Sequence, residues 1–170
     1  MEAPAINRLR DIFLISDTHF FHNNIIKYCG RPFHSVEEMN EHMADRWNSV
    51  VKPGDKVYHL GDVLMGPVSP GHFESFWPRL NGSKRLVVGN HDDIKYLSSG
   101  GFFQKVMMWR HFKEHNILLT HVPLHPDHIR HHGVNVHGHI HEKSSPKGPY
   151  KCVCVEQINY TPIHIEEVNK

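Results

Sequence analysis

Five short apolar segments of this chain each end in, or run directly into, side chains that can bind a metal ion. The segments DIFLIS, KVYHL and KRLVVG have the length and composition of buried strands. The five segments and their polar residues are 11–16 with Asp17 and His19, 56–60 with Asp62, 84–89 with Asn90 and His91, 116–121 with His121, and 133–141 with His139 and His141. In α/β sheets, ligand sites lie outside the carboxyl ends of the strands. We therefore expect an α/β fold in which these side chains converge at one edge.

Histidine occupies every second position of the segment NVHGHIHE, as His137, His139 and His141. In an extended segment, alternate side chains point to the same face. Burying several imidazoles on one face requires a partner for each of them. The pattern therefore indicates that this face meets polar groups or metal ions.

The other segments predict a mixture of helices and strands. Residues 35–50 are the clearest helix, because Ser35 and Glu38 form a capping box and one apolar stripe contains Met39, Met43, Trp47 and Val50. Other predicted elements are a helix over 71–80 that ends near Pro78, a hairpin of 106–112 with 116–121, strands within 150–158 and 161–168, and a surface loop over 143–150.

Composition limits the class of protein. The chain has 170 residues, of which 39% are hydrophobic and 22% charged, as expected of one globular domain spanning 1–170. A net charge of +1 gives no signal for nucleic acid or a membrane surface. No signal peptide or bilayer-spanning run is visible, and only 3 cysteines are present. We expect a reduced, cytoplasmic protein, and the sequence does not predict its oligomeric state.

Seven candidate ligands are more than one metal ion needs. They comprise two aspartates, one asparagine and four histidines: Asp17, Asp62, Asn90, His19, His121, His139 and His141. A zinc-type site takes about four ligands, whereas two ions about 4 Å apart that share a carboxylate would use the whole set. This mixture suits Mn, Fe, Zn, Ni or Co better than Mg or Ca. We therefore predict a cofactor of two divalent transition-metal ions.

The ordered motifs SDTH (16–19), LGD (60–62), GNHD (89–92), THVPL (120–124) and HGHIH (137–141) resemble those of the calcineurin-like metallophosphoesterase superfamily. The segments 17–33 and 155–163 are similar to its small bacterial and phage-type branch. The resemblance implies a four-layer fold in which two packed, mixed β-sheets are flanked by helices.

The resemblance also implies a role for each motif residue. Asp17, His19 and His141 would hold the first metal, and Asp62 would bridge to a second metal held by Asn90, His121 and His139. A hydroxide bridging the two ions would attack the phosphorus of a small phosphoester or nucleotide substrate. His91 would act as general acid or as a phosphate contact. Phosphodiesters are the expected substrates, and activity on phosphomonoesters stays open.

Several assignments are less constrained. His137 is expected to be hydrogen-bonded rather than ligating. Arg31 is either a substrate-phosphate contact or a solvated loop residue, and His22 could line the mouth of the site. The Asp-Arg-Gly of related protein phosphatases is absent after Asp62, so what orients His91 is open, with Asp92 or Asp93 as candidates.

An alternative class of function is a metal-binding scaffold of the same fold that acts through protein contacts. The superfamily's scaffold subunit lacks the catalytic histidine, whereas this chain has His91 and fills every ligand position. The sequence therefore favours the enzyme.

Overall fold

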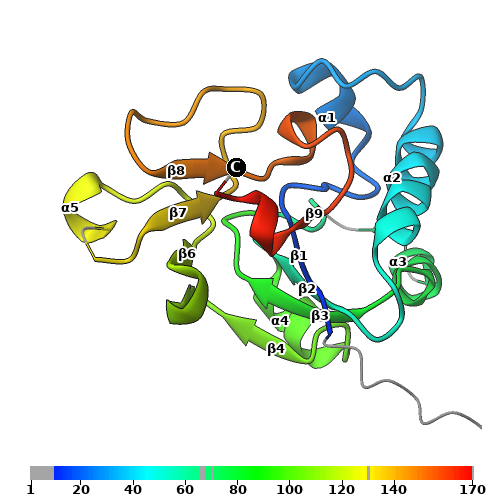
Figure 1. The fold of residues 1–170 in the computed structure, drawn as a ribbon. Coiled ribbons are helices and arrows are strands. Elements are labelled where there is room, and N and C mark those ends of the chain that lie inside the picture. The colour runs from blue at the N-terminus through cyan, green and yellow to red at the C-terminus, as the bar shows by residue number, and fades with distance from the viewer. Residues whose placement is uncertain (1–9, 66–67, 70, 130, 170) are drawn as a thin grey trace, which may run out of the picture.

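The computed structural model describes residues 10–65, 68–69, 71–129 and 131–169. Its strands form two mixed β-sheets, with helices packed around them (Figure 1). The predicted fold class, an α/β fold with two packed sheets, is therefore confirmed.

The first sheet has five strands in the order β4-β3-β2-β1-β9. These strands are β4 (Lys105–Met107), β3 (Ser83–Val87), β2 (Lys56–His59), β1 (Ile12–Ile15) and β9 (Ile163–His164). The first four are parallel, and β9 runs antiparallel to β1. β1 is apolar throughout (IFLI), and the last three residues of β2 (KVYH) are buried, because parallel strands in the middle of a sheet are covered on both faces.

The second sheet has four strands in the order β5-β6-β7-β8. These strands are β5 (Arg110–Phe112), β6 (Ile117–Leu119), β7 (Val134–His137) and β8 (Tyr150–Cys152). The last three are parallel, and β5 pairs antiparallel with β6. A parallel bridge between Ser16 and Cys154 joins the ends of β1 and β8, so the two sheets meet there.

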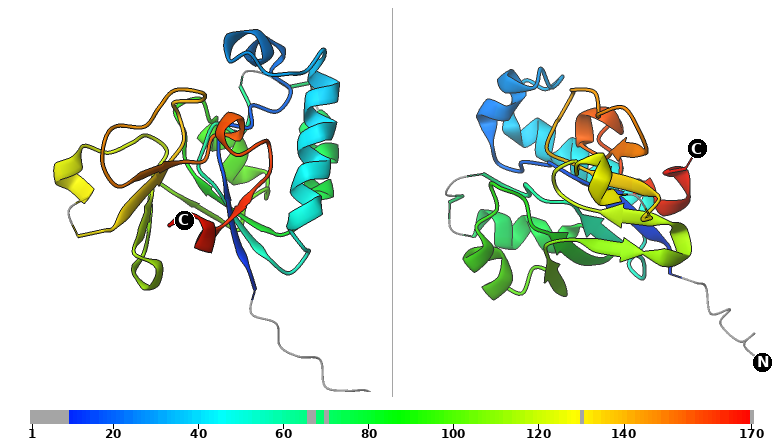
Figure 2. Two further views of the ribbon diagram at one scale, coloured as in Figure 1. Left: turned by 45° about the horizontal axis from the view of Figure 1, so that its top comes forward. Right: turned by 90° about the vertical axis from the view of Figure 1, so that its left-hand side faces the viewer.

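The predicted helix over 35–50 is present as α2 (Val36–Val50), and the Ser35 side chain caps it by accepting from the Glu38 N–H. In its apolar stripe, Met39, Met43 and Trp47 are fully buried, whereas Val50 is half-buried. Together with α3 (His72–Phe76) and the short 3₁₀ turn Trp77–Arg79, it lies on the side of the five-stranded sheet away from the other sheet (Figures 1 and 2).

The other helices are short. They are α1 (Asn23–Tyr28), α4 (Ile94–Ser99) and α5 (Pro126–Ile129), and the sequence patterns did not predict them. Short 3₁₀ turns cover Lys113–His115, Val155–Gln157 and Ile165–Glu167. Within the described part of the chain, no helix has both the length and the hydropathy needed to cross a membrane.

The predicted hairpin of 106–112 with 116–121 is wrong in its first half. Lys105–Met107 pairs with β3 in the five-stranded sheet, whereas Arg110–Phe112 pairs with β6 in the four-stranded sheet. The chain changes sheet at Met108 and Trp109. A continuous apolar run does not reveal such a change, because both halves have strand composition.

The loops after the strands bind one another at the carboxyl edge of the sheets. The Asp17 N–H donates to the Gly61 carbonyl at 3.0 Å, and the His19 N–H donates to the Asp62 carbonyl at 3.1 Å. The Gly138 N–H donates to the His121 carbonyl at 2.8 Å. These bonds join the loop after β1 to the loop after β2, and the loop after β6 to the loop after β7. The His139 N–H donates to Asp17 Oδ2 at 2.8 Å and so joins the two pairs, as the strand-end pattern predicted.

Candidate metal centre

Most of the predicted ligands have a left-handed backbone. The φ angles are 57° for Asp17, 48° for His19, 56° for Asp62, 70° for His139 and 52° for His141. This region is uncommon for residues other than glycine, although Asp, Asn and His enter it most readily. Such conformations concentrate at functional sites, where the surrounding structure must hold them.

The route by which His139 and His141 reach the site differs from the prediction. The sequence pattern assumed one extended strand with alternating side chains, but β7 ends at His137. The two later histidines follow in a turn, each with positive φ. Turn geometry, and not the pleat of a strand, therefore turns their side chains toward the other loops.

The first ligand group consists of Asp17, His19 and His141, whose ligand atoms all lie within 4.8 Å of one another. Asp17 Oδ1 is 4.0 Å from His19 Nε2 and 3.7 Å from His141 Nε2. These are the three residues predicted to hold the first metal.

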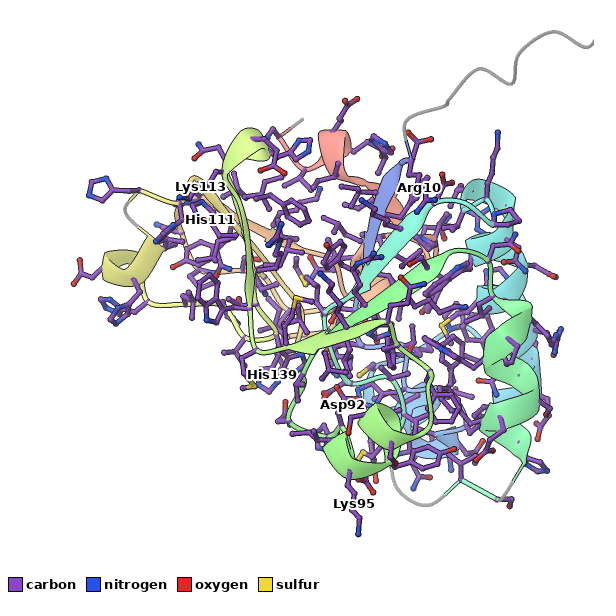
Figure 3. The ribbon with its side chains drawn as sticks, turned by 90° about the horizontal axis from the view of Figure 1, so that it is seen from below. Arg10, Asp92, Lys95, His111, Lys113 and His139 are labelled. Carbon is purple, nitrogen blue, oxygen red and sulfur yellow. The ribbon has the colours of Figure 1, made fainter. Side chains whose placement is uncertain are left out.

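The second ligand group consists of Asp62, His121 and His139, again with ligand atoms within 4.8 Å of one another. Asn90 joins it, because its Oδ1 is 2.8 Å from His121 Nε2 and 2.9 Å from His139 Nδ1. Figure 3 shows His139 near Asp92, of the Asn90 loop, at one edge of the molecule, with His111 and Lys113 well away from them.

Asp62 lies between the two groups. Its Oδ2 is 3.7 Å from His19 Nε2 in the first group and 3.5 Å from His121 Nε2 in the second. Its Oδ1 accepts the His91 backbone N–H at 2.9 Å. One carboxylate oxygen is therefore held by the protein while the other faces both groups, which is the arrangement that a bridging ligand requires.

The two carboxylate oxygens of Asp17 also have different roles. Oδ2 accepts the Ser16 hydroxyl at 2.5 Å and the His139 N–H at 2.8 Å. Oδ1 is buried and has no hydrogen-bond partner among the residues that the structure describes, and the same holds for both ring nitrogens of His19. Buried polar atoms without partners are costly. A cation between Asp17 Oδ1 and His19 Nε2 would satisfy both, so the residues fit a metal ion.

The titration of the ligands also suits a cation. Burial lowers the pKa of His19 to about 2, so its ring stays neutral, which is the form that binds metal. Burial also opposes a charge on His121, but its hydrogen bond to Asp62 and the nearby carboxylates outweigh this and raise its pKa to about 9. Without a metal, the two aspartates thus draw a proton onto His121.

Glu156 is a residue of the site that the sequence patterns missed. Its Oε1 accepts from His141 Nδ1 at 3.0 Å and from Arg31 Nε at 2.9 Å. The bond leaves His141 Nε2 free to face Asp17. A carboxylate behind a ligating histidine fixes the orientation of the ring. No local motif marks Glu156, because it lies in a 3₁₀ turn after β8.

Arg31 has a structural role, and both interpretations of it from the sequence need correction. Its side chain is fully buried, and besides Glu156 it donates to the carbonyls of Asp17 at 2.7 Å and Thr18 at 2.8 Å. The guanidinium therefore supports the first ligand loop from behind. It is neither a solvated residue nor exposed to a substrate phosphate.

Cys29, His141 and Glu156 also have possible ligand atoms within 4.8 Å of one another. However, Glu156 already binds both His141 and Arg31. Burial raises the pKa of the Cys29 thiol to about 12, so the thiolate needed for metal binding is disfavoured. We regard this group as the support of His141.

His91 lies beside the ligands without being part of either group. Its ring is exposed, with its centroid 5.8 Å from that of His19. Asp92 accepts from the backbone N–H groups of Asp62, Val63 and Gly89, and Asp93 caps α4. Both suggested aspartates thus have other partners, and among the described residues no side chain is hydrogen-bonded to the His91 ring.

The two other histidines considered from the sequence, His137 and His22, differ in burial. His137 is fully buried, and its ring nitrogens contact the Gly138 carbonyl at 2.8 Å and the Ser145 hydroxyl at 3.0 Å. It is hydrogen-bonded and outside both ligand groups, as expected. His22 is half-buried, with its ring centroid 5.6 Å from that of His19. Its contact with substrate stays a prediction.

Two known proteins, one compared by sequence and one by structure, are similar to this chain over nearly its whole length. No protein-family model matches. The uncharacterized protein MJ1445 of Methanocaldococcus jannaschii is 36% identical over 169 residues, which cover 95% of this chain and 91% of that protein. The solved structure of AQ665, a protein of unknown function from Aquifex aeolicus, has a TM-score of 0.73 at 27% identity and covers 95% of this chain and 98% of its own.

A more distant structure is that of a conserved uncharacterized protein, a predicted phosphoesterase, from Streptococcus pneumoniae. Its TM-score is 0.36 at 19% identity, with 85% of this chain and 71% of that chain covered.

Proposed function

We propose that this chain, which belongs to the same family as the archaeal protein MJ1445, is a dinuclear metal-dependent phosphoesterase. The observation that carries the proposal is the position of Asp62, whose Oδ2 faces His19 at 3.7 Å and His121 at 3.5 Å. A carboxylate shared by two ligand groups suits a pair of divalent transition-metal ions. The motif resemblance supports one domain of the calcineurin-like metallophosphoesterase superfamily.

When bound, the two cations supply a water activated near neutral pH and positive charge at the phosphoryl oxygens. The chain supplies the rest. Asp17, Asp62 and Asn90 fix the charge and geometry of the two groups. His91, exposed next to His19, would donate a proton to the leaving oxygen or a hydrogen bond to the phosphoryl group.

A phosphodiester is the substrate class that we propose, because a diester carries two organic groups for which an open, exposed rim leaves room. Asn90 and His139 are both exposed, so the site opens to solvent on the side of the second group. All three cysteines are free, which supports a reducing, cytoplasmic location.

The proposal is tested by metal content together with hydrolysis of bis-nitrophenyl phosphate. We expect protein reloaded with Mn²⁺ to approach two ions per chain and to hydrolyse the diester. Asp62→Asn should weaken both sites and remove most of the activity. His141→Ala is the matched comparison, and it should weaken mainly the first site because His141 belongs to the first ligand group and not to the second.

Two results would argue against this function. One is a plateau at one ion per chain with full activity, which would exclude a dinuclear mechanism. The other is normal binding of two ions with no hydrolysis of any diester or monoester under several metals. That second result would favour the metal-binding scaffold.

A further inference from the structure

An apolar cleft of about 770 Å³ adjoins the candidate metal centre. It lies between the loop after β3, the crossover from β4 to β5 and the loop after β6. Its apolar lining consists mainly of Ile94, Met108, Trp109, Leu118, Val122 and Leu124. Ligand pockets commonly have this size and this apolar character, with a few polar groups to fix orientation.

The cleft and the metal centre share two residues. Asn90 and His121 line the cleft, and they are also the residues whose Oδ1 and Nε2 lie 2.8 Å apart in the second ligand group. A molecule in the cleft would therefore have one end beside the second group. Asp92 and His132 also line the cleft. The His132 ring packs edge-on against His111, which lies outside the lining; Figure 3 labels Asp92 and His111.

Four apolar side chains of the cleft are strongly exposed. The exposed fractions are 68% for Met108, 61% for Trp109, 50% for Ile94 and 42% for Val122. Large apolar side chains gathered on one surface usually mark a binding site. An exposed indole presents a flat face for stacking, and methionine sulfur also contacts aromatic rings favourably.

The position of His91 assigns a role to the cleft. His91 is not among its lining residues. It lies instead beside His19 of the first group, at a centroid distance of 5.8 Å. If the leaving oxygen is near His91, the group in the cleft is the one that stays on phosphorus.

We infer that this cleft binds an aromatic substituent of a phosphodiester, the one retained on the phosphomonoester product. The inference rests on the proposed function and names its substrate class. Trp109 stacks on the ring, and Asn90 and His121 mark the end of the cleft at which the phosphoryl group enters the metal centre.

The kinetic test uses three nitrophenyl phosphodiesters whose retained ester group is benzyl, cyclohexylmethyl or methyl. The leaving group is the same in all three, so differences in kcat/KM report the retained group. We expect the benzyl ester to exceed the methyl ester by about ten-fold, equivalent to ~1.4 kcal/mol. Trp109→Ala should abolish this preference, and Trp109→Phe should keep most of it.

Val106→Ala is the matched control. Val106 is an exposed apolar residue of β4 outside the lining, so its loss should not change the preference. Equal kcat/KM for all three esters, or a cyclohexylmethyl ester as good as the benzyl ester, would overturn an aromatic subsite while leaving the proposed function intact.

A binding test does not depend on hydrolysis. The other two tryptophans, Trp47 and Trp77, are 0% and 2% exposed, so acrylamide quenching reports mainly on Trp109. Metal-loaded protein should be protected from the quencher by benzylphosphonate and not by methylphosphonate. If no ester is hydrolysed, the proposed function fails and this result alone decides the cleft.

Absence of protection would overturn the inference. So would protection that depends on protein concentration and accompanies self-association in sedimentation, because the cleft would then be covered by a second copy of the chain.

Discussion

His91 lies beside the candidate metal centre without belonging to either ligand group. Its backbone N–H holds Asp62 Oδ1 at 2.9 Å, while its ring is exposed. The main chain of this residue thus positions a ligand, and the side chain is free for the substrate. Removing the ring should therefore leave both metal sites intact.

The His91→Ala variant is expected to lose more activity on esters with poor leaving groups. An alkyl or nucleoside alkoxide needs a proton as it departs, whereas a nitrophenolate does not. General acid catalysis is typically worth about 10²–10⁴-fold. The measurement is kcat/KM against leaving-group pKa for wild type and variant. A steeper dependence in the variant supports the acid, parallel lines leave a phosphate contact only, and loss of a metal ion would make His91 a ligand.

Arg31 illustrates a buried charge that stabilises the site from behind. Its guanidinium pairs with Glu156 at 2.8 Å, and the two side chains are 0% and 6% exposed. Removing one partner of a buried pair leaves the other charge unpaired in the interior. This costs far more than the loss of a solvated pair.

Arg31→Met should therefore destabilise the metal-free protein by about 3–5 kcal/mol. The matched control is Arg79→Met, because Arg79 pairs with Glu41 at the surface, with side chains 51% and 54% exposed. Arg79→Met should lower the free energy of unfolding by only about 0–1 kcal/mol. Urea unfolding of both variants measures the difference. Similar losses in the two variants would contradict the role assigned to Arg31.

At the scale of elements, the site depends on how closely the loops after β2 and β3 approach. Gly61 has φ +98°, and a Cβ there would lie 2.5 Å from the Gly89 nitrogen and 2.7 Å from His121 Nδ1. Real Cβ atoms do not approach backbone so closely. The two loops can cross only because Gly61 has no side chain.

Gly61→Ala is expected to lower stability by at least the roughly 1–3 kcal/mol of an overpacked core site. It should also weaken binding to the second ligand group, since His121 has to move. Gly54→Ala is the control, because a Cβ at Gly54 meets nothing within 4 Å and its φ is not positive. Thermal unfolding and Mn²⁺ titration of both variants make the comparison. Equal behaviour of the two would show that the loop crossing tolerates a side chain.

Much of the fold follows from the sequence, and the failures have physical causes. The strands β1, β2 and β3 and the capped helix α2 were predicted because their apolar patterns and the Ser35 cap are local signals. The change of sheet at Met108 and Trp109 was not, because it depends on which partner strand is available. Such a choice is made by tertiary structure and leaves no mark in a short window.

The candidate site likewise has features that the sequence predicts and features that it does not. Its ligands were identifiable because Asp, Asn and His follow apolar runs. The left-handed backbone of His139 and His141 was not predicted, since their alternation imitates a strand. The roles of Arg31 and Glu156 were also missed, because residues 125 positions apart meet only in the folded chain.

At the scale of the whole molecule, the two ligand groups take residues from both sheets. Asp17, His19, Asp62 and Asn90 follow strands of the five-stranded sheet, and His121, His139 and His141 follow strands of the four-stranded sheet. The sheets also share a core, in which the rings of Tyr58 of β2 and Phe112 of β5 pack edge to face. The distance between their ring centroids is 5.1 Å. Metal ions would add a second set of interactions across the same interface.

Metal binding should therefore stabilise the whole fold. A ligand that binds only the native state at 100 times its Kd adds about 2.7 kcal/mol per site, which for a chain of this length raises Tm by roughly 5–10 °C. Calorimetry of EDTA-treated protein with and without Mn²⁺ measures this increment. Asp62→Asn should lose most of it, because Asp62 faces both groups, whereas Gly54→Ala should retain it. A Tm that does not respond to Mn²⁺ in the wild type would mean that the two groups do not bind ions in the folded protein, whatever the activity.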